Sequence, residues 1–194
     1  MSVTTEPPRH HLSKKIIVAI AAVVAAVILI GVVSALTGGS VTSGGRGGEV
    51  LPKSRLVGHQ IQSFSLVGLS GGEVHAPWSE GRASVLIFFA SWCTPCQGEM
   101  PKVAAYIRSH DPSPVDVVGI DANDERSAAQ SFVKKDGVTF PVAFDANGTV
   151  TSTIFDFQEL PESVFINAKG VVKRVHLGAI SEKALASGIK MLKG

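Results

Sequence analysis

Residues 16–36 read IIVAIAAVVAAVILIGVVSAL and carry no charged side chain over 21 positions. At a rise of about 1.5 Å per residue, a helix of this length spans roughly 30 Å, the thickness of the hydrocarbon core of a bilayer. A buried helix of a soluble domain would have a polar face, and this run has none. The run therefore predicts a single N-terminal transmembrane helix.

The charges around this run predict its orientation. Residues 1–15 carry three basic side chains and one acidic side chain, whereas residues 37–194 have no net charge, so the formal charge of +2 belongs to the tail. Because basic residues favour the cytoplasmic side, we expect a cytoplasmic tail and a globular part outside the cell membrane. The small residues at 33–35 could be a signal-peptidase cleavage site, so a cleavable signal peptide is an alternative. The length of the apolar run favours an uncleaved anchor.

The chain after the predicted anchor divides into a linker and one domain. Residues 37–53 are rich in glycine and serine, which predicts a flexible linker. Residues 54–194 have the length of a single globular domain. No clustered basic face is evident in this neutral part of the chain, so we expect no binding to nucleic acid.

Apolar patterning within residues 54–194 alternates between the periods of strands and helices. We expect an edge strand at 59–68, buried strands at 85–90 and 115–121, helices at 95–109, 125–135 and 181–192, and two strands around a turn at 167–170. The order strand, helix, strand, helix predicts a parallel βαβ unit that is extended by antiparallel strands and has helices on both faces.

Both cysteines of the chain lie in SWCTPCQGEMP, residues 91–101, where a predicted buried strand gives way to a helix. A structural zinc site needs four ligands, and neither a second cysteine pair nor a closely spaced histidine pair outside the tail accompanies Cys93 and Cys96. A structural disulfide between them would close a very short loop, which contributes only about 2 kcal/mol in the chain-entropy model. Neither alternative explains the location of the pair at a helix start.

A redox role explains this location. The positive end of the helix dipole and its unpaired N–H groups would favour the thiolate of Cys93 and lower its pKa from about 8.5. Cys96, one turn further along, would be buried and able to resolve a mixed disulfide formed on Cys93. Pro95 suits the first turn because it has no N–H to leave unpaired. Trp92 would shield one side of the sulfur and guide a partner chain. The pattern thus predicts a thiol–disulfide exchange centre.

The segment FFASWCTPCQGEMP resembles the TlpA/ResA-like branch of the thioredoxin-fold oxidoreductases, which are membrane-tethered and face outward, and the likeness extends over about residues 58–191. A second segment, ELPESVFINAKG, resembles the cis-proline loop of that family. The resemblance implies an α/β thioredoxin-like fold with a central mixed sheet flanked by helices. It also implies that Pro161 is a cis proline, that Leu160 packs against the disulfide, and that this backbone contacts a substrate peptide.

Two features depart from the pattern of thioredoxins proper. Those proteins have a buried Asp six residues before the first cysteine, where this chain has Ile87. ResA-like members have a Glu three residues after the second cysteine, and Glu99 matches it. We expect Glu99 to carry a proton during resolution, with its pKa raised by partial burial, although a solvated helix residue is the alternative. Asp156, Glu159 and Glu162 flank the proline loop, and we expect them to lie in water.

The direction of electron flow is open at this point. The Thr-Pro pair between the cysteines favours a reductant, and the resemblance implies reduction of haem-site cysteines of apocytochrome c with electrons from a membrane thiol carrier. The alternatives are an oxidase or isomerase of secreted proteins, and a copper-binding module in which His176 joins the cysteines. We expect protein thiols and disulfides as partners and no dissociable cofactor or metal, because the disulfide of Cys93 and Cys96 would be the redox group.

Overall fold

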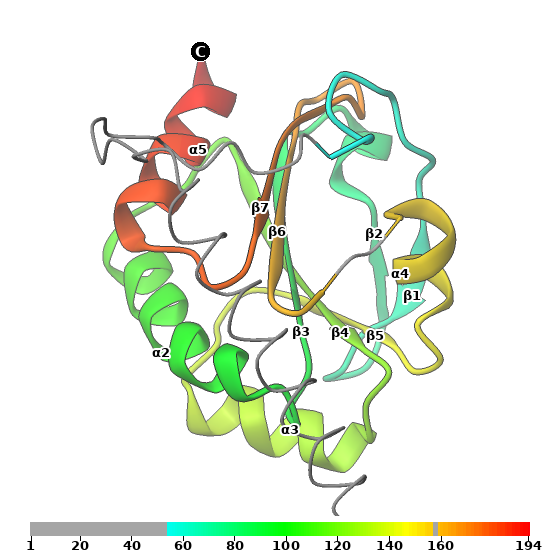
Figure 1. The fold of residues 1–194 in the computed structure, drawn as a ribbon, viewed down its shortest axis with the longest axis vertical. Helices are drawn as coiled ribbons and strands as arrows, with labels where there is room; N and C mark the ends of the chain where they lie inside the picture. The colour runs from blue at the N-terminus through cyan, green and yellow to red at the C-terminus, as the bar shows by residue number, and fades with distance from the viewer. Residues whose placement is uncertain (1–53, 157–158) are drawn as a thin grey trace, which may run out of the picture. The chain divides into compact units, whose positions relative to one another are not determined.

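The computed structural model describes residues 54–156 and 159–194. These residues form a domain built on a five-stranded mixed sheet (Figure 1). The chain divides into two units, Met1–Glu49 and Val50–Gly194, and the described residues all belong to the second. The predicted tail, transmembrane helix and linker lie outside the described residues. Within the part of the chain that is described, no helix has the length and apolar character needed to cross a bilayer.

The sheet has the strand order β5-β4-β3-β6-β7. The central strand β3 (Ser84–Phe89) is parallel to β4 (Asp116–Ala122), which is parallel to β5 (Val142–Asp145). On its other side β3 is antiparallel to β6 (Glu162–Ile166), which is antiparallel to β7 (Val172–Leu177). Every residue of β3 is fully buried, as its continuous apolar run predicts. The predicted βαβ unit and the hairpin after it are confirmed.

Helices cover both faces of this sheet. Three helices, α2 (Thr94–Ser109), α3 (Arg126–Lys135) and α5 (Glu182–Lys193), bury apolar residues in a cluster that also contains both cysteines. The other face packs against the 3-10 helix η1 (Pro77–Glu80) and the end of α4 (Thr149–Ile154). In Figure 1, α2, α3 and α5 lie on the left and lower side of the sheet, and α4 lies on the right. The three predicted helices are confirmed to within one residue at each end.

The predicted edge strand at 59–68 is shorter in the structure. Only β1 (Ser65–Val67) is a strand, and it pairs with β2 (Glu73–His75) across a turn that contains Gly71 and Gly72, both at positive φ. The rest of this segment makes isolated bridges, from Gln60 to Val171 and from Gly68 to Ala143. Because these bridges join it to different parts of the sheet, the segment does not follow one neighbouring strand.

Strand β5 and helix α4 are not predicted by the patterning. The strand has only four residues and the helix only six, which is too short for a periodic pattern to stand out. A side chain from the strand holds the start of the helix. Asp145 accepts hydrogen bonds from the backbone N–H of Thr151 at 2.8 Å and from its hydroxyl at 2.7 Å.

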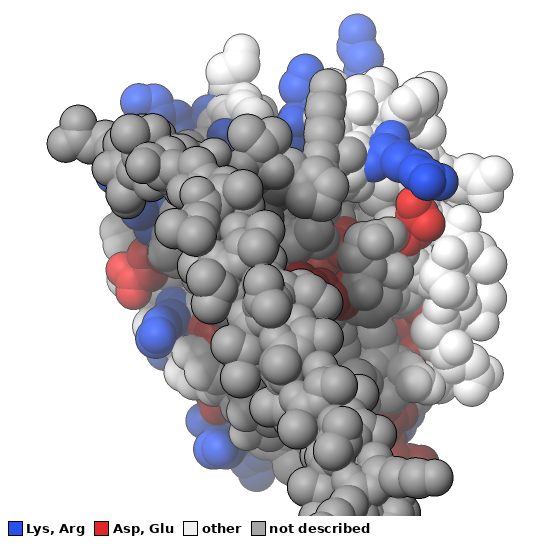
Figure 2. All heavy atoms as spheres, viewed as in Figure 1, with Lys and Arg blue, Asp and Glu red and all other residues white. Residues whose placement is uncertain are grey.

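Figure 2 shows the side of the molecule that faces the viewer in Figure 1. Basic and acidic side chains are both present over its described residues.

Candidate active site

The two cysteines form a disulfide at the junction between β3 and α2. Cys93 is the N-cap of α2, and its Sγ accepts a hydrogen bond from the backbone N–H of Cys96 at 3.2 Å. No acidic residue lies in the first turn of this helix to oppose its dipole. Cys96 is fully buried, whereas Cys93 retains 4% of its surface. In the reduced protein a sulfur at this helix N-terminus would be favoured as the thiolate, and burial shields the second sulfur.

The residues next to the cysteines lie at the surface. Trp92 is 59% exposed, an unusual state for a large apolar side chain, and its Nε1–H donates to the carbonyl of Asn123 at 3.0 Å. Pro95 occupies the first turn of α2 and is exposed. Two apolar side chains, those of Trp92 and Pro95, are therefore exposed beside the small accessible edge of Cys93.

The proline loop has the geometry expected from the sequence. The peptide bond between Leu160 and Pro161 is cis, and Leu160 packs against the apolar cluster that contains both cysteines. The carbonyl of Pro161 accepts a hydrogen bond from Gly178 N–H at 2.9 Å. A second cis bond, between Ser113 and Pro114, is not predicted from the sequence.

Glu99 is buried rather than solvated, with only 2% of its surface exposed. It follows Cys96 by three positions and therefore lies on the same face of α2. Its Oε1 accepts a hydrogen bond from the backbone N–H of Ile180 at 2.6 Å, and its Oε2 has no hydrogen-bond partner among the described residues. Burial raises the pKa of Glu99 to about 7, against the opposing effect of the Ile180 bond. The side chain can therefore hold or release a proton near neutral pH.

The expectation for the acidic residues around the proline loop is wrong at one position. Asp156 and Glu159 are exposed as expected, but Glu162 is only 1% exposed. Glu162 begins β6 and pairs with Phe88 of β3 on one side and with Leu177 of β7 on the other. Its position between two strands removes it from water. The polar residues around it in the sequence do not indicate that it pairs with these strands.

Another acidic pair near the cysteines is not singled out by the sequence. Asp124, in the loop after β4, accepts hydrogen bonds from the backbone N–H of Ser91 at 2.5 Å and from its hydroxyl at 3.0 Å. Asp121, at the end of β4, is fully buried. The only signal in the sequence is an acidic residue at the end of a buried strand, the edge at which the parallel strands of an α/β sheet present functional groups.

The remaining residues named from the sequence are also placed. Ile87 is fully buried in the same cluster as the cysteines. His176 is partly exposed on β7, and its Nε2 lies 3.4 Å from the carbonyl of Ala179. Within residues 54–156 and 159–194, no three His, Cys, Asp or Glu side chains group together in a way that could hold a metal ion.

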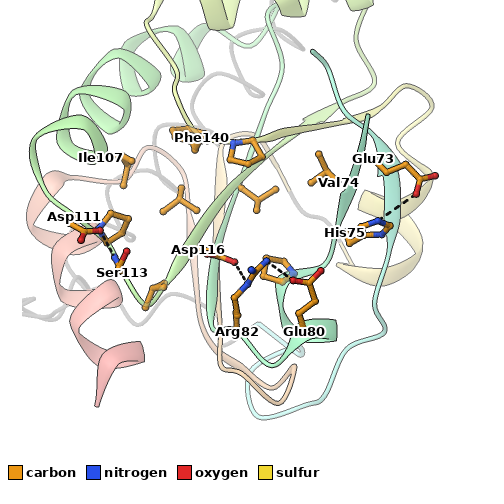
Figure 3. Close-up of a pocket in the computed structure, with 16 residues that line it drawn as sticks. Glu73, Val74, His75, Glu80, Arg82, Ile107, Asp111, Ser113, Asp116 and Phe140 are labelled. Atoms are coloured by element: carbon orange, nitrogen blue, oxygen red, sulfur yellow. Dashed lines mark hydrogen bonds and ion pairs between the residues drawn. The ribbon is translucent and has the colours of Figure 1, made fainter. Parts of the chain in front are cut away.

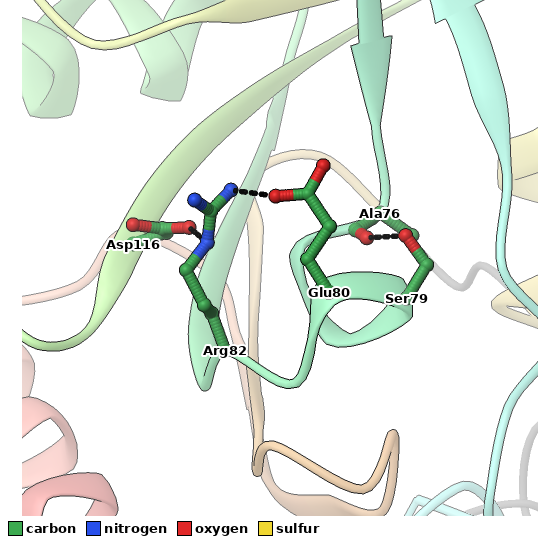
Figure 4. Close-up of polar contacts among 5 residues, drawn as sticks. All are labelled: Ala76, Ser79, Glu80, Arg82 and Asp116. Carbon is green, nitrogen blue, oxygen red and sulfur yellow. Dashed lines mark hydrogen bonds and ion pairs between the residues drawn. The ribbon is translucent and has the colours of Figure 1, made fainter.

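A cavity of about 470 Å³ lies at the opposite end of β3 from the cysteines (Figure 3). Arg82 bridges Asp116 at 2.7 Å and Glu80 at 2.9 Å there, and the hydroxyl of Ser79 donates to the carbonyl of Ala76 at 2.6 Å (Figure 4). The Arg82 ion pairs are half-exposed and therefore contribute little to stability. The pair with Asp116 joins the segment before β3 to the start of β4, and the pair with Glu80 joins that segment to η1.

The fold and the cysteine pair define a thiol–disulfide oxidoreductase with a thioredoxin-like fold. The chain belongs to the AhpC/TSA family, whose model matches residues 57–175.

Curated relatives and solved structures agree with this assignment. The chain is 27% identical to the thiol-disulfide oxidoreductase ResA of Halalkalibacterium halodurans over 70% of this chain and 77% of the relative. It is also 27% identical to ResA of Bacillus subtilis, over 70% and 75%. The structure of MTB dsbF in its mixed oxidized and reduced forms is 34% identical, covers 66% of this chain and 94% of that one, and has a TM-score of 0.60. A secreted Mycobacterium tuberculosis disulfide oxidoreductase homologous to E. coli DsbE is 28% identical, over 66% and 96%, with a TM-score of 0.59.

Proposed function

We propose that this protein reduces disulfides of proteins outside the cytoplasm, tethered to the cell membrane by residues 16–36. Its substrates would be the haem-site cysteines of apocytochrome c, and a membrane thiol carrier would return electrons to the disulfide. The observation that carries disulfide exchange is the cap formed by Cys93 on α2, with a fully buried Cys96 behind it. The reducing direction is proposed on the Thr-Pro pair between the two cysteines. Further support comes from the relatives that are named thiol-disulfide oxidoreductases and from the secreted relative of known structure.

The exchange proceeds in two steps without a dissociable cofactor. The thiolate of Cys93 attacks one sulfur of the substrate disulfide, forms a mixed disulfide and releases the other substrate sulfur as a thiolate. Cys96 then loses its proton and attacks the Sγ of Cys93, which releases the second substrate sulfur. The substrate gains two electrons and two protons, and Cys93 and Cys96 become a disulfide. Trp92 and Pro95 border the attacked sulfur, while Leu160 and Pro161 hold the substrate backbone.

The reduction potential tests the proposed direction of electron flow. We expect a value below about −200 mV for equilibration of the full chain with a glutathione buffer, because a reductant must have a stable disulfide. A value near about −120 mV would instead identify an oxidase. Cys93→Ala should remove the two-electron couple altogether and serves as the control. Tight binding of one Cu(I) ion per chain would favour the copper-binding alternative.

Replacement of Glu99 by Gln tests its role as the proton carrier. The ionised carboxylate accepts the proton of Cys96, so the wild-type resolution rate should rise with pH through about 7, the pKa of Glu99. In Glu99→Gln this rise should disappear, and the rate at pH 8 should fall on the order of 100-fold. Stopped-flow measurement of substrate release from the mixed disulfide checks this. An equal loss at every pH would indicate a structural role only.

The same substitution has a predictable effect on stability. Because burial raises the pKa of Glu99 from 4.5 to about 7, the folded state binds this proton more tightly than the unfolded state. Stability should therefore fall as the pH rises from about 4.5 to 7, by on the order of 2–3 kcal/mol. Gln keeps an oxygen that can accept from Ile180 and carries no charge, so Glu99→Gln should remove this contribution and leave the one from Asp121, whose pKa burial also raises. Urea unfolding of the oxidised protein at several pH values measures it.

A further inference from the structure

The loop that carries Trp92 and Cys93 is held by the loop that follows β4. Ser91 donates two hydrogen bonds to the carboxylate of Asp124, and the indole N–H of Trp92 donates to the carbonyl of Asn123. The carboxylate of Asp124 thus sets the position of the residue two places before the attacking sulfur. None of these contacts involves the sulfur atoms, so they are separate from the exchange chemistry itself.

Asp121 lies near the end of β4, three positions before Asp124. It pairs in register with Phe89 of β3, and alternation along β4 places it on the same face as Val117, a member of the cluster that contains the cysteines. It is fully buried, and neither of its carboxylate oxygens accepts a hydrogen bond from a described residue. An ionised carboxylate in such a place would carry a large desolvation cost. Asp121 is therefore expected to hold a proton in the folded protein.

Two charged groups affect the protonation of Asp121, namely Asp124 and Arg126. A protonated Asp121 can donate a hydrogen bond to Asp124, and this contact favours the protonated form. The positive charge that acts on Asp121 is that of Arg126, from the first turn of α3. Its guanidinium is already engaged by the carbonyls of Gly68 and Leu69 at 3.2 and 3.3 Å and lies over the ring of Phe144. The strand β3 presents only the apolar Phe89 beside Asp121.

We propose that Asp121 and Asp124 share one proton and together position the loop that carries Trp92 and Cys93. Asp121 is the proton donor and Asp124 the acceptor, so that the carboxylate of Asp124 remains oriented towards Ser91. Asp121 is thus a positioning residue, not a catalytic one, because it acts on the sulfur only through the loop. The effect on the rate of disulfide exchange rests on the proposed function, whereas the shared proton and the positioning of the loop do not.

The pair should respond to pH in one direction. Burial raises the pKa of Asp121 to about 8, with further contributions from the charge of Asp124 and their hydrogen bond, opposed by Arg126. Below this pH the pair carries a single negative charge and holds Ser91. Above it both carboxylates are ionised and repel each other, so the contact to Ser91 should loosen.

The test follows the indole N–H of Trp92 by NMR in the oxidised full-length chain, where no thiol titrates. We expect its resonance to titrate with a midpoint near pH 8 in the wild type. Asp121→Asn should abolish this titration and keep the low-pH position, because its amide can still donate to Asp124. Asp136→Asn is the matched control, because burial also raises the pKa of Asp136, which lies at the other end of α3. It should leave the titration unchanged.

A second measurement separates this inference from the proposed function. We expect the exchange rate of the reduced wild type to fall about threefold or more relative to Asp121→Asn as the pH rises from 7 to 9. If the Trp92 resonance does not titrate, or titrates equally in Asp121→Asn, the shared proton is refuted. If the resonance titrates as expected but the wild type exchanges no disulfides, the proposed function fails and the proton pair stands. If the wild type exchanges disulfides at a normal rate but the Trp92 resonance does not titrate, the shared proton is refuted and the proposed function stands.

Discussion

Cys96→Ala should accumulate a stable mixed disulfide between Cys93 and its substrate. Cys93 can still attack, since it caps α2 and retains exposed surface, but no second sulfur remains to release the captured chain. Turnover should fall by roughly 10³-fold or more, as expected when one member of a unit that acts together is removed. Non-reducing electrophoresis of the full chain expressed in cells, followed by identification of the bound proteins, measures the effect and names the substrates.

The reciprocal variant is the control for this trap. Cys93→Ala leaves only Cys96, which is fully buried, so we expect neither turnover nor a captured partner. Equal trapping by both variants would show that the sulfurs do not have distinct roles. Undiminished turnover by Cys96→Ala would show that resolution does not use this sulfur, and the two-step scheme would then be wrong.

Gly188→Ala should destabilise the domain by about 1–3 kcal/mol, since overpacking a tight core site is costly. Gly188 is buried on α5, and a Cβ there would lie 2.0 Å from Cε1 of Phe165 and 2.5 Å from two other ring atoms. Phe165 is itself fully buried in β6 and has little room to move. The helix would have to shift away from the sheet. Guanidinium unfolding of the oxidised chain measures the loss.

A second glycine in a helix supplies the matched control. Gly98 is exposed on α2, and a Cβ there would meet no described atom within 4 Å beyond its chain neighbours and the local backbone of its own helix. Gly98→Ala should therefore raise stability by about 0.5–1 kcal/mol through helix propensity alone. If the two substitutions have the same sign, the close packing of α5 on Phe165 is not the reason for the glycine at position 188.

The sequence predicts long and strongly patterned elements well and short elements poorly. The apolar run of β3 is confirmed as a buried strand, and α2 and α5 are confirmed as helices. The predicted cap of α5 is also present, because Ser181 accepts a hydrogen bond from Ala184 N–H. By contrast, β5 and α4 are missed because so few residues leave no clear period. The edge strand is overestimated because its partners come from separate parts of the sheet.

The sequence by itself determines the cysteine pair at a helix start, because the residues that specify it are neighbours in the chain. The cis bond before Pro161 is implied by the family resemblance and is confirmed. Only the tertiary structure decides the environment of the carboxyl groups. Glu99 is bonded to Ile180, 81 positions away, and Glu162 lies between two strands that enclose it. Asp121 is buried where β4 meets the cysteine loop. Burial sets a carboxyl pKa through desolvation, and desolvation depends on segments that are remote in the sequence.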